Sequence, residues 1–195
     1  MKHLRNDVVS ILSKTPNSSP HNTKTMINLQ LFPHHTGVWE GTYVRINPDG
    51  TVTGKWRSKL TIRMLSTDHY HQVNEYFWED GHYELHDFGV CAFNENGELI
   101  FDNPRILGKA WETHDSVVLT WSYKDQPGSN LYEMIDLIGE EKKHRIRTWK
   151  WSLNDEFQGL TMIDERQTAI QSEIPESFYE NLASRRFMGV SRSNK

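Results

Sequence analysis

The chain has 195 residues, enough for one domain with a substantial core but too few for two full domains. Its 22 basic and 26 acidic residues are interspersed and leave a net charge of -4, so no field attracts nucleic acid or an anionic membrane. We expect neither partner. Cys91 is the only cysteine and allows no internal disulfide, and no apolar run has the length of a signal peptide or membrane helix. A cytoplasmic protein is the default expectation.

The N-terminal region does not have the composition of a folded segment. Residues 13–25, SKTPNSSPHNTKT, are rich in Ser, Thr, Asn and Pro and cannot bury enough apolar surface to hold a fold. We therefore predict a flexible lead over residues 1–30. A single domain is expected over residues 31–190.

From Gly37 onward, turn signals recur at short intervals. Gly and Asn accept positive φ, and Pro presets its own φ, so clusters of these residues with Asp indicate turns. Such clusters occur at residues 47–50, 79–81, 94–97, 126–130 and 153–156. The segments between them are rich in β-branched and aromatic residues, which is typical of strands. The predicted strands are one that starts at Gly37, then 51–65, 69–78, 82–93, 98–102, 105–112, 117–124, 131–138, 144–153 and 159–169.

About ten sequential strands joined by short turns imply an antiparallel meander. A meander of this length closes on itself or leaves two long edges open to aggregation. We predict an all-β fold, a closed up-and-down barrel of about 8–10 strands, with an interior large enough for a small ligand. A two-sheet sandwich without a cavity is the alternative. Residues 174–187 have Pro175 at a position typical of a first helical turn, then acidic and finally basic residues, which predicts a short C-terminal helix beside one barrel mouth.

Residues Gly37-Val38-Trp39 resemble the Gly-x-Trp motif of the calycin superfamily, which contains lipocalins and fatty-acid-binding proteins. The resemblance implies that Trp39 closes one end of the barrel and that an arginine from a late strand packs over it. The segment HRIRTWKWS offers Arg145 and Arg147, and we favour Arg147. A guanidinium over an indole contributes roughly 1 kcal/mol when shielded from water.

A wider set of motifs is similar to an uncharacterised family of single-domain calycin-like proteins in bacteria and fungi. The similarity runs from about residue 32 to residue 168 and includes VWEGTYVRINPDG, NEYFWEDG, ILGKAWE, VVLTWSYKDQPG, LYEMI, RIRTWKWS and TMIDER. The similarity implies a calycin-like fold but indicates almost nothing about an activity. Cyanobacterial relatives of this type are bilin lyases, and other calycin-like barrels cyclise or isomerise a bound substrate without a cofactor.

Strand alternation selects the candidate binding residues. If Trp39 points inward, Tyr43 and Arg45 do so too, with Arg45 near a rim or in the cavity. On another strand Asn74, Tyr76 and Trp78 share one face, which is either pocket lining or an exterior aromatic ladder. We expect Trp111 and Trp121 to pair diagonally across a hairpin and to line one cavity, unless they only fill the core. The predicted ligand-binding residues are Trp39, Tyr43, Asn74, Trp78, Trp111, Trp121, Arg147 and Trp149.

Two carboxylates lie in apolar strand contexts, Glu133 in LYEMIDL and Glu165 in TMIDER. Such a carboxylate is paired, hydrogen-bonded or raised in pKa, and a raised pKa suits a general acid or base. Glu133, Glu165 and Tyr76 are therefore the candidate catalytic residues, with Arg147 orienting an anionic or carbonyl group of a substrate. The alternative reading makes both glutamates members of cross-strand ion pairs.

The ten histidines do not form a convincing metal site. His69 and His71 share one strand face and His82 and His86 another, but the turn at residues 79–81 pairs residue 74 with 86 and so offsets the two sets. No phosphate loop and no Ser or Cys nucleophile motif occurs. We expect no metal and no cofactor.

Three functions remain open at this stage. The first is binding of a hydrophobic or aromatic small molecule inside the barrel. The second is a cofactor-free cyclase or isomerase that acts on a natural-product-like substrate by acid–base catalysis. The third, implied only by the family resemblance, is a lyase-like protein that binds a bilin chromophore. A homodimer is also compatible with the sequence.

Overall fold

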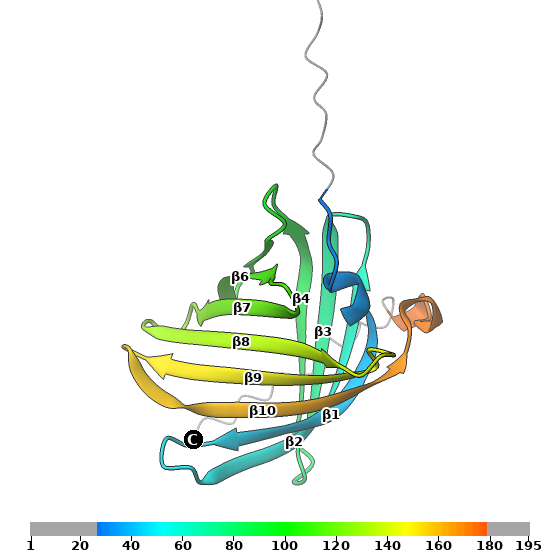
Figure 1. The fold of residues 1–195 in the computed structure, drawn as a ribbon. Coiled ribbons are helices and arrows are strands. Elements are labelled where there is room, and N and C mark those ends of the chain that lie inside the picture. Colours follow the sequence, from blue (N-terminus) through cyan, green and yellow to red (C-terminus); the bar gives the residue numbers. More distant parts are fainter. Residues whose placement is uncertain (1–26, 179–195) are drawn as a thin grey trace, which may run out of the picture.

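The computed structural model describes residues 27–178, and these form one closed barrel of ten strands (Figure 1). The predicted flexible lead over 1–30 lies almost entirely outside the described residues, as does most of the helix predicted over 174–187. The strands are β1 Gly37–Ile46, β2 Val52–Met64, β3 His69–Phe77, β4 Tyr83–Phe93, β5 Leu99–Asp102, β6 Ile106–Glu112, β7 Ser116–Tyr123, β8 Ser129–Ile138, β9 His144–Leu153 and β10 Glu156–Ala169. The 3-10 turns are η1 Phe32–His35 and η2 Gln171–Glu173.

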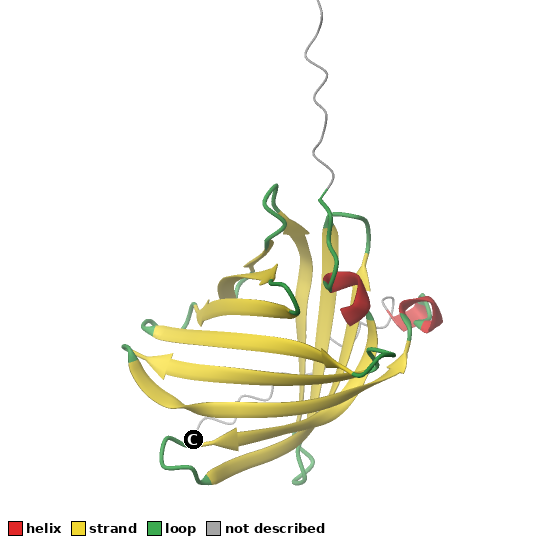
Figure 2. Ribbon diagram, in the orientation of Figure 1, coloured by secondary structure: helices red, strands yellow, loops and turns green. Residues whose placement is uncertain are grey.

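Each strand pairs antiparallel with its neighbours in the chain, and β1 also pairs with β10. Tyr43 shows this closure directly, since it lies between Trp56 on β2 and Ile163 on β10. The predicted closed meander is therefore confirmed, and the two-sheet sandwich is wrong. Strands account for nearly all of the regular structure (Figure 2), and no helix in the described part of the chain is long and apolar enough to cross a membrane.

Strand alternation assigns the two faces of β1. Trp39 and Tyr43 are fully buried, whereas Glu40 is exposed. Arg45 points inward as expected and lines the interior cavity. The predicted inward and outward faces of this strand are thus confirmed.

The two glycines that flank Trp39 have separate structural reasons. Gly37 has a φ of 109°, a backbone conformation that L side chains rarely adopt. Gly41 lies opposite Glu165 on β10, and a Cβ at this position would clash with the Asp164 carbonyl oxygen and lie 2.6 Å from Cγ of Glu165. The missing side chain of Gly41 therefore leaves the space that the Glu165 side chain occupies.

The segment before β1 covers one end of the barrel. The carboxylate of Glu112, at the end of β6, accepts hydrogen bonds from the backbone N–H groups of Gln30, Leu31 and Phe32 at 2.6–2.8 Å. Phe32 is buried, with its ring centroid 4.8 Å from that of Phe93. We call this the covered end; the other end, where β1 and β9 finish, is the open end, and in Figure 1 the two lie on opposite sides of the barrel.

Gly41→Ala tests the close approach of β1 and β10. The added methyl group must push apart the backbone of Asp164 and the side chain of Glu165, so we expect the free energy of unfolding to fall by about 2 kcal/mol. Urea denaturation measures the change. Thr42→Ala, on the outer face of the same strand, is the control, and an equal effect of both substitutions would contradict the packing argument.

Candidate ligand-binding cavity

The inner face of the barrel encloses a cavity of about 540 Å³. This volume lies within the range of pockets that hold drug-sized molecules. The lining side chains come from all ten strands and from η1. The cavity is therefore a property of the closed barrel and not of one loop or hairpin.

One side of the cavity is apolar. Its side chains belong to β5 through β8, which are consecutive in the barrel. Most of the lining residues on these strands carry no hydrogen-bonding group on the side chain, and the exceptions are Trp121 and Tyr123 on β7 and Glu133 on β8. The main members are Leu99, Phe101, Ala110, Val117, Leu131 and Ile135.

Another part of the lining carries a polar stripe on β3, which lies two strands from β5 and five strands from β8 in the ring of ten. The Tyr70 hydroxyl donates to Gln72 Oε1 at 2.7 Å, and Gln72 Nε2 donates to Asn74 Oδ1 at 2.8 Å. Asn74 Nδ2 then donates to the Tyr76 hydroxyl at 2.9 Å. Because these residues are two apart, all of them line the cavity. The lining thus combines hydrogen-bonding groups on β3 with a mainly hydrocarbon surface on β5–β8.

Two arginines and two glutamates form a buried ion network between these sides. Arg145 Nε donates to Glu165 at 2.5 Å, and Arg147 Nε donates to Glu133 at 2.5 Å. Arg147 Nη1 lies 3.2 Å from Glu165 and links the two pairs. The four side chains are at most 4% exposed. Their charges cancel, which is the condition under which ions remain stable away from water.

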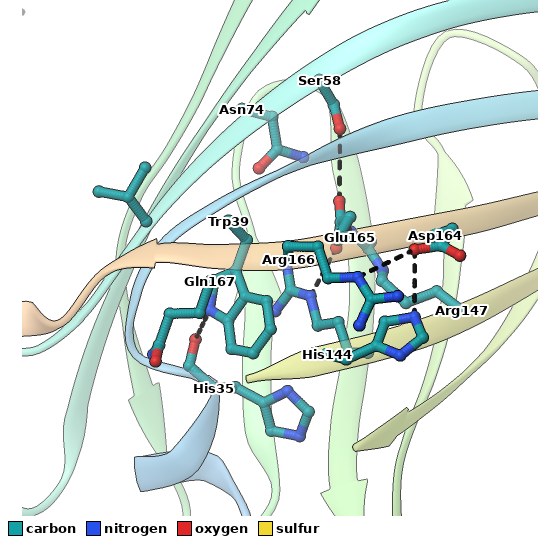
Figure 3. A network of polar contacts seen from close by, with 12 residues as sticks. His35, Trp39, Ser58, Asn74, His144, Arg147, Asp164, Glu165, Arg166 and Gln167 are labelled. Atoms are coloured by element: carbon teal, nitrogen blue, oxygen red, sulfur yellow. Dashed lines mark hydrogen bonds and ion pairs between the residues drawn. The ribbon is translucent and has the colours of Figure 1, made fainter. Parts of the chain in front are cut away.

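Neutral side chains complete the network. The Tyr43 hydroxyl accepts a hydrogen bond from Arg147 Nη1 at 2.9 Å. Ser58 donates to Glu165 at 3.4 Å, and Figure 3 shows this contact between the two side chains. The Glu165 carboxylate is therefore contacted by side chains from β2 and β9, although it belongs to β10.

The network keeps Glu165 and Arg147 charged. Burial by itself raises the pKa of Glu165, but the charges and hydrogen bonds of Arg145 and Arg147 outweigh it and hold that pKa below its ordinary value. Burial likewise disfavours the charged form of Arg147, yet Glu133, Tyr43 and Glu165 raise its pKa well above the ordinary range. Glu165 is thus a carboxylate and Arg147 a guanidinium at neutral pH.

Trp39 closes the covered end beneath one of these arginines. Arg145 Cζ lies 4.4 Å from the centroid of the Trp39 ring, and Trp39 Nε1 donates to the His35 carbonyl at 2.9 Å (Figure 3). The prediction that Arg147 packs over Trp39 is wrong. Arg147 is in register with Ile163, which is also the partner of Tyr43, so its side chain lies at the level of Tyr43 and further from the covered end.

Comparison with known proteins agrees with this geometry. The sequence matches the family described as "Domain of unknown function (DUF3598), N-terminal" over residues 26–170. The chain belongs to the DUF3598 family. No curated protein matches it.

Two solved structures resemble this DUF3598 barrel. One is a DUF3598-family protein with unknown function from Nostoc punctiforme, at 17% identity and a TM-score of 0.53, with 72% of this chain and 49% of that chain covered. The chain thus spans about half the length of the Nostoc protein. The other is an S-type phycobiliprotein lyase from Guillardia theta, at 14% identity and a TM-score of 0.54, with 70% and 90% covered. At such identities the likeness shows a shared fold, which agrees with the predicted calycin-like barrel.

The structure pairs both candidate catalytic glutamates with arginines. Glu133 and Glu165 point into the barrel, but each is held by a guanidinium, so the ion-pair alternative is confirmed. The expected raised pKa is wrong for Glu165. Burial raises the pKa of Tyr76 to about 12, so its hydroxyl stays protonated and can act as a hydrogen-bond donor. A catalytic role for the three residues stays a prediction.

The DUF3598 barrel brings most of the predicted binding residues to the cavity. Asn74, Trp78, Trp121, Arg147 and Trp149 line it. By contrast, Trp39 and Tyr43 are fully buried beneath its wall. Their side chains support the lining and are not part of it.

Trp111 does not share the cavity with Trp121. Trp121 is in register with Gly108 and Trp111 with Val118, so the two indoles lie on opposite faces of the β6–β7 hairpin. Gly108 makes room for Trp121, since a Cβ there would lie 2.5 Å from the Trp121 Cβ. The expectation of a diagonal pair is wrong because Trp111 is three positions from Gly108, the partner of Trp121, and an odd offset along a strand places side chains on opposite faces.

Several lining residues were missed by the sequence reasoning. Trp56 is the cross-strand partner of Tyr43, with ring centroids 5.4 Å apart, and Trp151 follows Trp149 by two positions. Hairpin register and strand alternation could have found both. His35 also reaches the cavity, and burial followed by the charge of Arg145 lowers its pKa well below the ordinary value, so the ring is neutral. No local pattern marks it.

The histidines follow the predicted offset. Asn74 is in register with His86, and Trp78 N–H donates to the His82 carbonyl, as the turn at 79–81 requires. Within residues 27–178, no group of three His, Cys, Asp or Glu side chains could hold a metal ion. Cys91 is buried and burial raises its thiol pKa to about 11. It is an unreactive thiol at neutral pH.

Glu165→Gln tests the ion network. The substitution keeps the shape of the side chain but leaves Arg145 and Arg147 with one carboxylate between them. We expect the free energy of unfolding at neutral pH to fall by about 3–5 kcal/mol, measured in urea. Glu40→Gln, an exposed carboxylate on β1, should change it by less than about 0.5 kcal/mol.

The lowered pKa of Glu165 predicts that the stability of the protein depends on pH. The folded pKa of Glu165 lies below its ordinary value of 4.5, so its contribution to stability is present above that pH and is lost as the pH falls through the folded pKa. We expect the urea midpoint of the wild-type protein to fall more steeply on acidification than that of Glu165→Gln. Parallel pH profiles of the two proteins would show that Glu165 is not held as a stabilised carboxylate.

Proposed function

We propose that this DUF3598 barrel binds a hydrophobic or aromatic small molecule in its cavity. The observation that carries the proposal is the cavity itself, about 540 Å³ with an apolar wall on β5–β8 and indoles from β2, β7, β9 and the residue after β3. A flat ring gains dispersion contacts and favourable edge-to-face geometry against such walls. The arrangement of Trp121 and Trp149, edge to face at 5.5 Å, is one example already present in the lining.

Hydrogen bonds to the polar stripe would fix the orientation of the bound molecule. Gln72 and Asn74 each use one N–H group in the chain of hydrogen bonds along β3, and each amide has a second N–H group. A guest with a carbonyl or hydroxyl on one edge satisfies these donors while its other edge packs on hydrocarbon. This supports an elongated molecule with polar groups along one side.

The paired glutamates support binding over acid–base catalysis. A general acid or base requires a group that changes its protonation state near neutral pH, whereas the arginines stabilise the charged form of Glu165. The lowered pKa of Glu165 therefore argues against this residue as the acid or base of a cyclase or isomerase. Chromophore binding, of the kind suggested by the name of the Guillardia protein, rests on the shared fold, and a bilin is one arm of the test below.

N-phenylnaphthylamine, an uncharged probe that fluoresces in apolar surroundings, tests the proposal. We expect one probe per chain and an affinity about tenfold weaker in Ala110→Phe, because the new ring enters the cavity from the apolar wall. Leu107→Phe, whose side chain is exposed on the outer face of the same strand, is the matched control. Circular dichroism and a thermal melt establish that both variants fold.

Native mass spectrometry of the protein from its own host then identifies the guest. A retained mass that is absent from Ala110→Phe names the ligand class, and added biliverdin tests the chromophore arm. An absence of probe binding in the wild-type protein, or equal binding by the wild-type protein and Ala110→Phe, would overturn the proposal.

A further inference from the structure

Two arginines that line the cavity have no carboxylate partner among residues 27–178. Arg45 on β1 and Arg105, one residue before β6, both line the cavity. Neither forms an ion pair with a carboxylate of residues 27–178, whereas Arg145 and Arg147 are each bound to glutamate. The cavity therefore contains a compensated pair of cations in its middle and an uncompensated pair elsewhere.

Chain direction places both uncompensated arginines at the open end. β1 runs from Gly37 at the covered end, so Arg45, next to its last residue, is at the open end. β6 finishes at Glu112, whose carboxylate holds the covering segment, so Arg105 before its start is also at the open end. β1 and β6 lie five strands apart in the ring, and the two arginines approach the opening from opposite sides.

Each guanidinium rests on an aromatic ring of the wall. Arg45 Cζ lies 4.4 Å from the centroid of Trp151, and Arg105 Cζ lies 5.3 Å from that of Tyr123. Stacking occupies the face of a guanidinium and leaves its N–H edges available for a planar oxyanion. It also limits side-chain motion, which lowers the entropy lost when an anion binds.

One carboxylate lines the cavity in the same half of the barrel. Glu84, near the start of β4, accepts hydrogen bonds from His86 at 2.7 Å and from His82 at 3.1 Å. Its hydrogen bonds therefore go to histidines of its own hairpin and not to either guanidinium. Arg45 and Arg105 keep their hydrogen-bonding capacity for a ligand.

We propose that the open end is an anion-binding subsite, and that the guest is an amphiphile whose carboxylate, sulfonate or similar oxyanion lies between Arg45 and Arg105. This rests on the proposed binding function. The apolar part of the guest enters first, because the arginines deeper in the barrel are already neutralised by Glu133 and Glu165 and offer no free charge to an acid. The anionic group then stays at the opening, where water completes its solvation.

A matched pair of probes separates this inference from the binding function. Anilinonaphthalene sulfonate carries the ring system of N-phenylnaphthylamine plus one sulfonate. We expect the sulfonate probe to bind about tenfold more tightly than the uncharged probe at low salt, and added sodium chloride to reduce that preference. Ala110→Phe should weaken both probes, which places both in the cavity.

Substitutions at the opening assign the preference to residues. Arg45→Gln removes the charge of a half-buried side chain and should weaken the sulfonate probe about fivefold to tenfold, while Arg105→Gln, at an exposed position, should weaken it about threefold. The uncharged probe should bind these arginine variants and the wild-type protein equally. Arg57→Gln, an exposed arginine on the outer face of β2, is the control, and Arg45→Lys should retain part of the preference.

The outcomes are distinguishable. If neither probe binds, the proposed function fails and this inference fails with it. If both probes bind with equal affinity, or if the sulfonate preference survives in the double variant Arg45→Gln with Arg105→Gln, the cavity function stands and the anion subsite is overturned.

Discussion

The structure depends on charge compensation inside the barrel. Four ionised side chains in a low-dielectric interior are tolerable only because two guanidiniums and two carboxylates meet with short hydrogen bonds. The network joins β8, β9 and β10, and through Tyr43 and Ser58 it also contacts β1 and β2. These five strands include the β1–β10 pair that closes the barrel. The network therefore links closure of the sheet to the centre of the cavity.

The same network divides the interior by function. At the covered end, Arg145 over Trp39 seals the barrel, and the segment held by Glu112 lies outside that seal. Beyond the network the cavity opens between an apolar wall and the hydrogen-bonded stripe of β3. Because the central charges cancel, an uncharged guest body meets no uncompensated ion there. The free positive charge lies at the open end instead.

Two glycines leave the space that larger side chains of the cavity region occupy. Gly41 leaves room for Glu165, and Gly108 leaves room for Trp121, because each faces the larger side chain on the adjacent strand. A methyl group at either position would lie at clash distance. In a closed sheet such a clash cannot be relieved by splaying one edge, since no edge is free. Positions without side chains are thus part of the site's geometry.

The sequence by itself determined the strand order, the antiparallel meander and the inward face of β1, because turn residues and period-two alternation are local properties. It also pointed to the paired state of Glu133 and Glu165 as one of two readings. Only the tertiary structure decided that Arg145, and not Arg147, covers Trp39, and that Trp111 faces outward. These outcomes depend on the register between strands, where a shift of one or two residues changes the partner of every side chain.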